Sequence, residues 1–334
     1  MKKGITKILS ACVFAFVVFL AAGTQSKAAV NMGVKQTGAG SSYVDLAWDA
    51  QLGAGHYHTQ FSQDGKNWID MDNSSSPSES VYNLTQGASY YARVVAYKGS
   101  HYTGTHVMIG VSETAIVSTK PTEVSGLTQT AAGVNSVSMS WNASAGAASY
   151  VIYGYINYNW TQIGTSATNS ATITGVAATT STRFSVAAVK NVTGGTVTGD
   201  QCSGVEMKAI PIKVSRIAMQ YYWDSLKEAK YIWTDVNNAD GYQYEVKSAN
   251  GKKTYFRATS TNSYTYVKPF PRGIFVKARV RAYVTVGNKV YYGAWSPYTY
   301  HASSKKVTAK RSSNGKKIYL KWKKVSGASG YQVY

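Results

Sequence analysis

The sequence predicts an all-β chain of tandem seven-stranded antiparallel β-sandwiches. Three observations predict this fold class: a repeat of about 92 residues, alternation of apolar and polar residues in short segments, and the composition. Tyr occurs 27 times and charged residues make up only 15% of the 334 residues. Aromatic and β-branched residues favour pleated, half-buried strands, and this length allows two to four domains.

The repeat is marked by a Trp that is followed nine residues later by a Tyr. The four Trp residues are separated by 93, 92 and 89 residues. The pairs are Trp48 and Tyr57, Trp141 and Tyr150, Trp233 and Tyr242, and Trp322 and Tyr331. Because four pairs share one offset, we expect each pair to hold the same place in a repeated domain.

Each pair is embedded in segments whose side chains alternate in polarity. In the first repeat, Val44, Leu46 and Trp48 end one such segment, and Tyr57 opens the next. A third alternating segment follows 44 to 45 residues after the Trp, where residues 92–97 and 278–283 match as Ala-Arg-Val-Val-Ala-Tyr and Ala-Arg-Val-Arg-Ala-Tyr. Alternation with a period of two predicts strands with one buried face.

Glycine-containing pairs predict the hairpins that join these strands. Asp64-Gly65 and Asn250-Gly251 follow the strand that the Tyr opens, and Gly194-Gly195 and Gly287-Asn288 follow the third alternating segment. Such pairs favour tight turns between antiparallel strands. Regularly spaced short strands with these turns predict a sandwich.

The arrangement resembles fibronectin type III domains. In that family the Trp lies on the second strand, the Tyr on the third, and a Leu followed six residues later by a Tyr leads into the sixth. Leu84 and Tyr90 match this feature in the first repeat, whereas Thr182 and Val276 stand where the Tyr is expected in the second and third. The hydrogen bond of that tyrosine is therefore in question in those repeats.

The resemblance covers nearly the whole chain after residue 28. It implies fibronectin type III-like repeats over 29–119, 120–208 and 209–302, and an incomplete fourth repeat over 303–334 that holds the first three strands. The segment 323–331 is similar to repeats of surface proteins from Gram-positive gut bacteria. We expect this last repeat to be cut short by the end of a truncated gene product, and the alternative is a natural tail that pairs with another chain.

Residues 1–28 read as a signal peptide, which predicts a secreted protein associated with the cell surface. Lysines precede an apolar run at 8–22, which is shorter than a membrane span, and Ser26-Lys27-Ala28 provides small residues for cleavage. Membrane contact is expected only through this cleaved leader. Its removal takes Cys12 and leaves Cys202 alone, which excludes an intrachain disulfide.

Positive charge is concentrated after residue 208. Lys and Arg number 4 against 7 Asp and Glu in the first repeat, 14 against 5 in the third, and 9 against 0 in the tail. Lys277, Arg279 and Arg281 alternate with apolar residues and should line one sheet face. This face is either a solvated surface that resists aggregation or a site for extracellular polyanions; export disfavours nucleic acid as a partner.

The sequence predicts no metal site and no cofactor. His56 and His58 could share one face of a strand, and His101, His106 and His301 are the other histidines. Two ligands do not make a zinc site, so we expect the first two histidines to lie on a solvent-exposed strand. The segment 70–73 faintly suggests a calcium loop, but a polar turn is the expectation because the glycine and glutamate of such loops are missing.

Aromatic side chains are the candidate recognition groups, because sugar rings stack on flat side chains. Trp68 and Trp160 follow their repeat Trp by 20 and 19 residues, and Tyr155 and Tyr158 crowd the second. These four residues are the candidate glycan-stacking residues. The alternative is that they cover the outer sheet of each sandwich.

The predicted function is a non-catalytic extracellular module array, which serves as a spacer or adhesion segment at a bacterial surface. Its predicted partners are cell-wall polymers, host glycans or other surface proteins. The sequence motifs of catalytic sites are missing and the repeats occupy the mature chain, so we expect no enzyme within these residues. The alternative is an N-terminal accessory region of a larger secreted hydrolase whose catalytic domain lies beyond residue 334.

Overall fold

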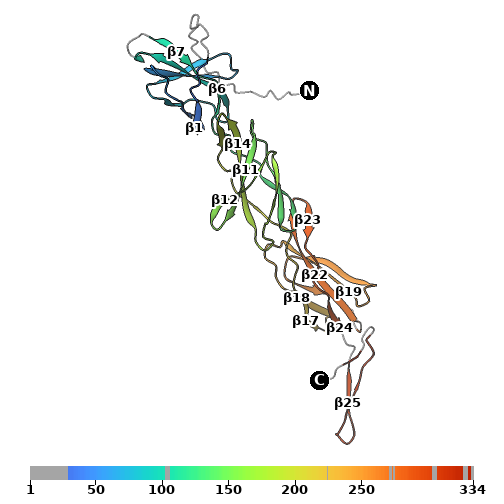
Figure 1. The fold of residues 1–334 in the computed structure, drawn as a ribbon. Coiled ribbons are helices and arrows are strands. Elements are labelled where there is room, and N and C mark those ends of the chain that lie inside the picture. Colours follow the sequence, from blue (N-terminus) through green and yellow to red (C-terminus); the bar gives the residue numbers. More distant parts are fainter. Residues whose placement is uncertain are drawn as a thin grey trace, which may run out of the picture. The chain divides into compact units, whose positions relative to one another are not determined.

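The structure is a computed structural model that describes residues 29–101, 106–223, 225–270, 273, 275–302, 307–325 and 330–331. All the regular elements of these residues are β-strands (Figure 1), so the predicted all-β fold class is confirmed. In the same residues no helix has the length and hydropathy of a membrane span. The predicted signal peptide at 1–28 lies outside the described residues.

The chain divides into two units, of which the first runs to Thr122 and also takes in Lys190–Thr198. The first unit contains the first sandwich. Its strands are β1 (Lys35–Ala39), β2 (Val44–Ala47), β3 (His56–Ser62), β4 (Ile69–Ser74), β5 (Ser78–Val81), β6 (Ser89–Lys98), β7 (Val107–Val111) and β8 (Ala115–Ser118). One sheet has the order β1-β2-β5. The other has the order β4-β3-β6-β7, and β8 also pairs with β6.

The second unit comprises Glu123–Val189 and the chain from Gly199 onward. The second sandwich takes most of its strands from this unit, whereas the end of β14 and all of β15 are counted with the first. Its strands are β9 (Thr128–Gly133), β10 (Ser136–Ser140), β11 (Ser149–Ile156), β12 (Asn159–Ser166), β13 (Ser170–Thr174), β14 (Thr182–Val192), β15 (Gly195–Thr198) and β16 (Val205–Met207). Its sheets have the orders β13-β10-β9 and β12-β11-β14-β15, with β16 also on β14. This is the topology of the first sandwich.

The third sandwich repeats the topology again. Its strands are β17 (Ile217–Trp223), β18 (Glu228–Trp233), β19 (Gly241–Ser248), β20 (Thr254–Ser260), β21 (Tyr264–Val267), β22 (Phe275–Val286), β23 (Lys289–Tyr292) and β24 (Thr299–Ala302). The sheets are β17-β18-β21 and β20-β19-β22-β23, with β24 also on β22. A hairpin of β25 (Thr308–Arg311) and β26 (Ile318–Lys321) follows.

Each sandwich has seven strand positions, because the last strand is formed in two pieces. In the first sandwich, β7 and β8 pair with successive parts of β6. Where the last strand is interrupted between its two pieces, a side chain accepts a hydrogen bond from the backbone of the neighbouring strand. Ser112 Oγ accepts a hydrogen bond from Val94 N at 2.8 Å, and Ser296 Oγ accepts one from Val280 N at 3.0 Å.

In the second sandwich, the side chain of Cys202 is the partner of the neighbouring strand's amide. Its Sγ lies 3.3 Å from Val186 N, and its own amide donates to the Val186 carbonyl at 3.0 Å. The buried free thiol is therefore a backbone partner inside the sandwich. A buried N–H that loses such a partner is costly.

The Trp and Tyr rings of each pair contact one another, and in the three complete sandwiches this contact joins the two sheets. The ring centroids lie 5.4, 5.2, 5.5 and 5.4 Å apart in the four pairs, with edge-to-face angles of 60° to 67°. Both rings are buried in the three complete sandwiches. Such aromatic pairs contribute free energy beyond their buried area.

The Tyr hydroxyl also fixes the loop that joins the paired strands. It accepts a hydrogen bond from the backbone N–H three residues after the Trp in all four repeats. The donors are Gln51 to Tyr57 (3.0 Å), Ser144 to Tyr150 (3.0 Å), Val236 to Tyr242 (2.8 Å) and Val325 to Tyr331 (2.5 Å). The nine-residue spacing is the length of loop that brings ring and hydroxyl into place together.

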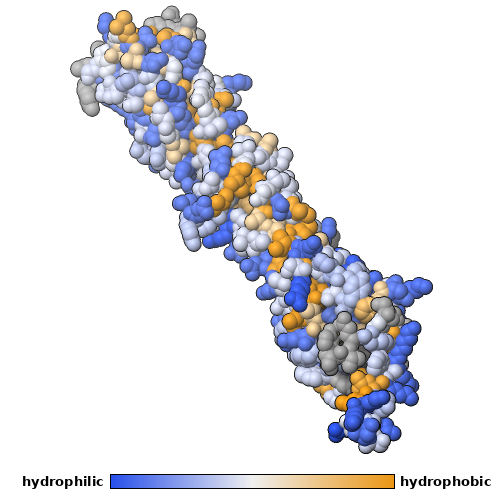
Figure 2. All heavy atoms as spheres, turned by 60° about the horizontal axis from the view of Figure 1, so that its bottom comes forward, coloured by the Kyte–Doolittle hydropathy of each residue, from blue (hydrophilic) through white to orange (hydrophobic). Residues whose placement is uncertain are grey.

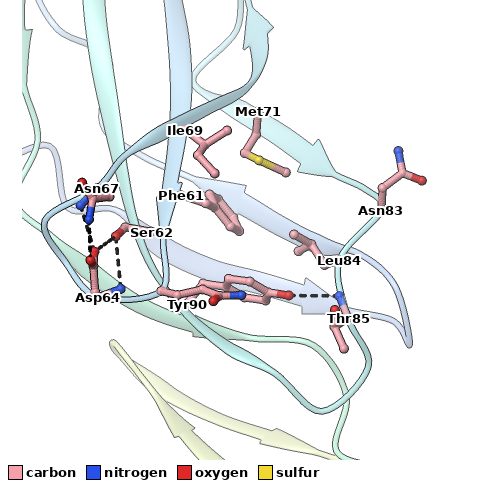
Figure 3. Close-up of a pocket in the computed structure, with 11 residues that line it drawn as sticks. Phe61, Ser62, Asp64, Asn67, Ile69, Met71, Asn83, Leu84, Thr85 and Tyr90 are labelled. Atoms are coloured by element: carbon pink, nitrogen blue, oxygen red, sulfur yellow. Dashed lines mark hydrogen bonds between the residues drawn. The ribbon is translucent and has the colours of Figure 1, made fainter. Parts of the chain in front are cut away.

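Several local expectations from the sequence are confirmed. Gly65, Gly194, Gly251 and Gly287 have positive φ angles of 72°, 82°, 76° and 56° in the hairpins where they were expected. Tyr90 Oη accepts a hydrogen bond from Thr85 N at 3.0 Å (Figure 3). The second and third sandwiches carry Thr182 and the fully buried Val276 in its place.

The polar turn expected at 70–73 is wrong. These residues lie in β4, where Asp70 is paired with Gln60 and Asp72 with Thr59 of β3. The Asp70 carboxylate accepts a hydrogen bond from the Gln60 amide at 2.7 Å. Edge-strand pairing with β3 satisfies the backbone of this segment despite its polar composition.

We predict that Tyr57→Phe destabilises the first sandwich by about 1 kcal/mol, because the Gln51 N–H loses its acceptor while the ring contact with Trp48 remains. Hydrogen exchange of the β3 and β6 amides measures this change. Tyr82→Phe, which alters a tyrosine that is 57% exposed, should leave exchange unchanged. Equal exchange in the Tyr57 variant and the wild-type chain would contradict the role assigned to the hydroxyl.

We also predict that Cys202→Ser is nearly neutral, whereas Cys202→Ala destabilises the second sandwich by about 1–3 kcal/mol. The serine hydroxyl replaces the thiol as partner of Val186 N, as Ser112 and Ser296 do for their strands, and alanine offers no partner. Denaturant unfolding of the two variants checks this difference. Similar losses in both would assign the thiol to packing alone.

Candidate functional site

The outer sheet faces carry the polar and aromatic side chains that distinguish the three sandwiches. On the face of the molecule drawn in Figure 2, apolar residues form patches between hydrophilic ones. Scattered exposed apolar residues are normal on protein surfaces. The candidate sites are therefore the places where particular side chains are held together.

The structure brings Lys277, Arg279 and Arg281 to one face of β22, where they alternate with buried residues. Each cation lies over aromatic rings. Arg279 is 4.3 Å from the centroid of Trp295 and 4.8 Å from that of Tyr298, and Lys277 is 4.6 Å from Tyr298. Such contacts attract a cation to the ring and shield it in part from solvent.

Arg281 belongs to the same layer. Its guanidinium lies 3.8 Å from the centroid of Tyr292 and 4.5 Å from that of Trp295. Two of its nitrogens donate to Gln243 Oε1, at 2.9 and 2.6 Å. The three predicted cations thus form a stacked layer with aromatic residues from the neighbouring strand and the segment that follows it.

A buried carboxylate lies beneath this layer. Glu245 has no exposed side-chain surface and accepts hydrogen bonds from Arg279 Nε at 2.6 Å and Arg257 Nη2 at 2.5 Å, and Lys247 Nζ lies 3.2 Å away. Burial raises the pKa of Glu245, but hydrogen bonds from the three cations outweigh it and lower the pKa to about 2. Much of the positive charge of Arg279 is therefore compensated within the sandwich.

Of the predicted stacking residues, Trp160, Tyr155 and Tyr158 lie together on the β11–β12 hairpin, and Trp68 lies in the first sandwich. Tyr155 is paired with Trp160 across the strands, with ring centroids 5.3 Å apart. The two side chains are 39% and 37% exposed, whereas Tyr158 is 90% exposed. Trp68 differs, because the Arg93 guanidinium lies 4.1 Å from the centroid of its ring.

The indole of Trp160 is held by its surroundings. A Cβ at Gly204 would lie 2.7 Å from Trp160 Cη2, so only glycine leaves room for the ring there. The hairpin turn holds Asn157 and Tyr158 at φ angles of 49° and 64°. Glycine and asparagine are the usual residues for positive φ, and a bulky aromatic residue there is strained.

Four histidines of the first sandwich form a cluster that the sequence did not predict. His56, His58, His101 and His106 each offer a ring nitrogen, and these nitrogens all lie within 4.8 Å of one another. The expected solvent-exposed strand is wrong for His56, which is 2% exposed. Burial, opposed by the charge of Asp70, lowers the pKa of His58.

The sequence did not predict this cluster because its four histidines come from two segments that only the tertiary structure brings together. The His-x-His pair signals only that two imidazoles share a strand face. His101 and His106 belong to the connection between β6 and β7, more than 40 residues later in the chain. The remaining histidine, His301, lies in the third sandwich against Tyr231.

An apolar groove of about 690 Å³ opens at the edge of the first sandwich (Figure 3). Its lining includes the core residues Phe61, Leu84 and Tyr90 together with Met71. Asp64 closes one end of it. Its carboxylate accepts the amides of Asn67 and Lys66 and the Ser62 hydroxyl, which together hold its pKa well below the usual range.

No protein-family model matches the chain, and no curated protein matches it. Among solved structures, the chain is similar to the crystal structure of the chicken CNTN1 FN1-FN3 domains, with 16% sequence identity and a TM-score of 0.33. The match covers 82% of this chain and 98% of that chain. The fold is established by the strands themselves, which form tandem fibronectin type III-like sandwiches.

We predict that acid selectively destabilises the third sandwich through Glu245. The pKa of about 2 lies below the ordinary value of 4.5, so the ionised carboxylate stabilises the fold above pH 4.5 and this contribution is lost as the pH falls toward 2. Unfolding of the wild-type chain and of Glu245→Gln at several pH values measures the effect. The variant should lack this part of the pH dependence, and parallel curves would contradict the assignment.

Proposed function

We propose that this protein is a non-catalytic extracellular module array that serves as a spacer and adhesion segment at a bacterial surface and contacts cell-wall or host glycans. The hairpin of the second sandwich is the proposed contact. Tandem sandwiches that each have a core of their own suit a spacer. The leader-like sequence at 1–28 supports the extracellular location.

The observation that carries the proposal is the strained, exposed Tyr158 beside the Tyr155–Trp160 pair. A glycine at the second turn position would avoid the strain of a φ of 64°. Tyr158 instead places a 90% exposed ring at the hairpin tip. Strain of this kind is retained where a side chain has a use, and aromatic rings next to one another offer stacking surfaces for sugar rings.

The basic layer of the third sandwich is a second candidate contact, for acidic glycans or wall polymers. Lys277, Arg279 and Arg281 lie on one face, as such a site requires. Their stacking and the Glu245 bridge reduce the positive charge available to a ligand. The aromatic hairpin is therefore the stronger candidate, because the Tyr158 ring is 90% exposed.

We predict that Trp160→Ala and Tyr158→Gly each weaken retention on isolated bacterial cell walls and on immobilised glycans. The matched control is Trp223→Ala, which removes a Trp that is 44% exposed in the third sandwich. Retention should fall for the two hairpin variants and persist for the control. Full retention by folded Trp160→Ala would exclude the hairpin as the contact.

The same hairpin yields a stability prediction. Tyr158→Gly should stabilise the second sandwich by about 1 kcal/mol, because glycine adopts the left-handed conformation without strain. Hydrogen exchange of the β11 and β12 amides measures this gain. A variant that binds less while being more stable would separate recognition from folding, whereas a loss of stability would remove the strain argument.

A further inference from the structure

Four imidazoles converge on the outer face of the first sandwich. His56 and His58 lie two residues apart on β3, on the face opposite the core residues Tyr57 and Phe61. His101 and His106 lie in the connection from β6 to β7. All six ring pairs within this cluster have centroids between 5.1 and 6.2 Å apart.

Hydrogen bonds determine which nitrogen of His56 faces the cluster. Its Nδ1 lies 2.9 Å from the Gly99 carbonyl oxygen. A carbonyl only accepts, so Nδ1 carries the proton and donates it. With the proton on Nδ1, the neutral tautomer has a lone pair at Nε2, which lies 3.1 Å from His106 Nδ1.

This arrangement is the one that metal-binding histidines use. A ligating imidazole typically donates its second N–H to a backbone carbonyl or carboxylate, which orients the ring and fixes the tautomer. Two glycines permit the approach of the carbonyl. A Cβ at Gly55 would lie 2.2 Å from the Gly99 oxygen, and Gly99 itself has a φ of 91°.

The Tyr97 ring contacts two of the four imidazoles. The Tyr97 ring stacks on His56 at 5.1 Å with an interplanar angle of 10°, and its centroid lies 4.9 Å from that of His58. His58 Nε2 is buried and has no hydrogen-bond partner among the described residues. An orphaned buried ring nitrogen inside a cluster of imidazoles is explained by a ligand that accepts its lone pair.

We propose that His56, His58, His101 and His106 form a four-imidazole site for a divalent transition-metal ion, with Zn²⁺ as the best match. Nitrogen ligands at zinc lie about 2.0–2.1 Å from the ion, so neighbouring ligands in a tetrahedron are roughly 3.3 Å apart. The His56–His106 nitrogens are already at 3.1 Å, and the widest separation of 4.8 Å closes by side-chain rotation. On binding, the proton that His106 Nδ1 shares with His56 is released or moves to its Nε2.

Four imidazole nitrogens determine which ions the site can bind and what the bound ion does. Imidazoles suit Zn²⁺, Cu²⁺ and Ni²⁺, whereas Ca²⁺ and Mg²⁺ require oxygen ligands. Four protein ligands fill a tetrahedral site, and filled zinc sites are structural. The ion therefore fastens the β6–β7 connection to β3 and stabilises the first sandwich.

The test titrates the full chain, stripped of metal with a chelator, with Zn²⁺ alone. We expect one ion per chain by calorimetry, an increase in the unfolding temperature of the first sandwich that grows with Zn²⁺ concentration, and no effect of Ca²⁺. X-ray absorption of the zinc-loaded protein should show nitrogen ligands at about 2.0 Å. Co²⁺ should give the absorption spectrum of a tetrahedral site.

Variants separate a metal site from a packed histidine cluster. His106→Gln and the double variant His58→Gln with His106→Gln should lose the bound ion but keep the metal-free unfolding temperature, because His106 is exposed and His58 half-buried. His301→Gln, outside the cluster, should still bind one ion. The proposal is overturned if Zn²⁺ does not bind, if the double variant binds it as well as the wild type, or if Ca²⁺ stabilises the chain equally.

Discussion

The contact of each repeated Trp with the Tyr nine residues later is the constraint on which the sandwiches depend. In the three complete sandwiches the Trp ends or directly follows a strand of the three-stranded sheet and the Tyr lies on a strand of the facing sheet, so the ring contact joins the two layers of the core. The Tyr hydroxyl also accepts a hydrogen bond from the backbone amide three residues after the Trp. The Tyr side chain thus packs against the Trp in the core and also holds the loop between the two residues. Because both contacts need the same loop length, the spacing of nine residues from Trp to Tyr is constant.

The same inner framework carries three different outer faces. Arg93 and Arg279 hold corresponding places, and each donates from Nε to a side chain of the adjacent strand, Gln60 in the first sandwich and Glu245 in the third. Around this shared contact the first sandwich gathers histidines and the third builds cations over aromatic rings. Because alternate residues point outward, the outer face can change while the core residues stay in place.

Inside the sandwiches, polar groups at the interrupted last strand are matched one for one. Ser112, Cys202 and Ser296 each accept the amide of the neighbouring strand at the point where its pairing changes. The chain tolerates a free thiol here because the thiol is buried and engaged. The packing of each sandwich and the chemistry of its outer face are therefore separable, and substitutions can probe them independently.

The sequence by itself determined the repeat, the strands and the hairpins, because alternation and turn residues are local signals. It also placed Lys277, Arg279 and Arg281 on one face, since alternation along a single strand decides that. It mistook residues 70–73 for a turn and His56 for an exposed residue, because edge pairing and covering by a distant connection leave no local pattern. Only the tertiary structure decided that His101 and His106 meet His56 and His58, that Glu245 compensates Arg279, and that Arg93 covers Trp68. Those contacts join residues far apart in sequence, and their distances follow from how the chain closes into sheets.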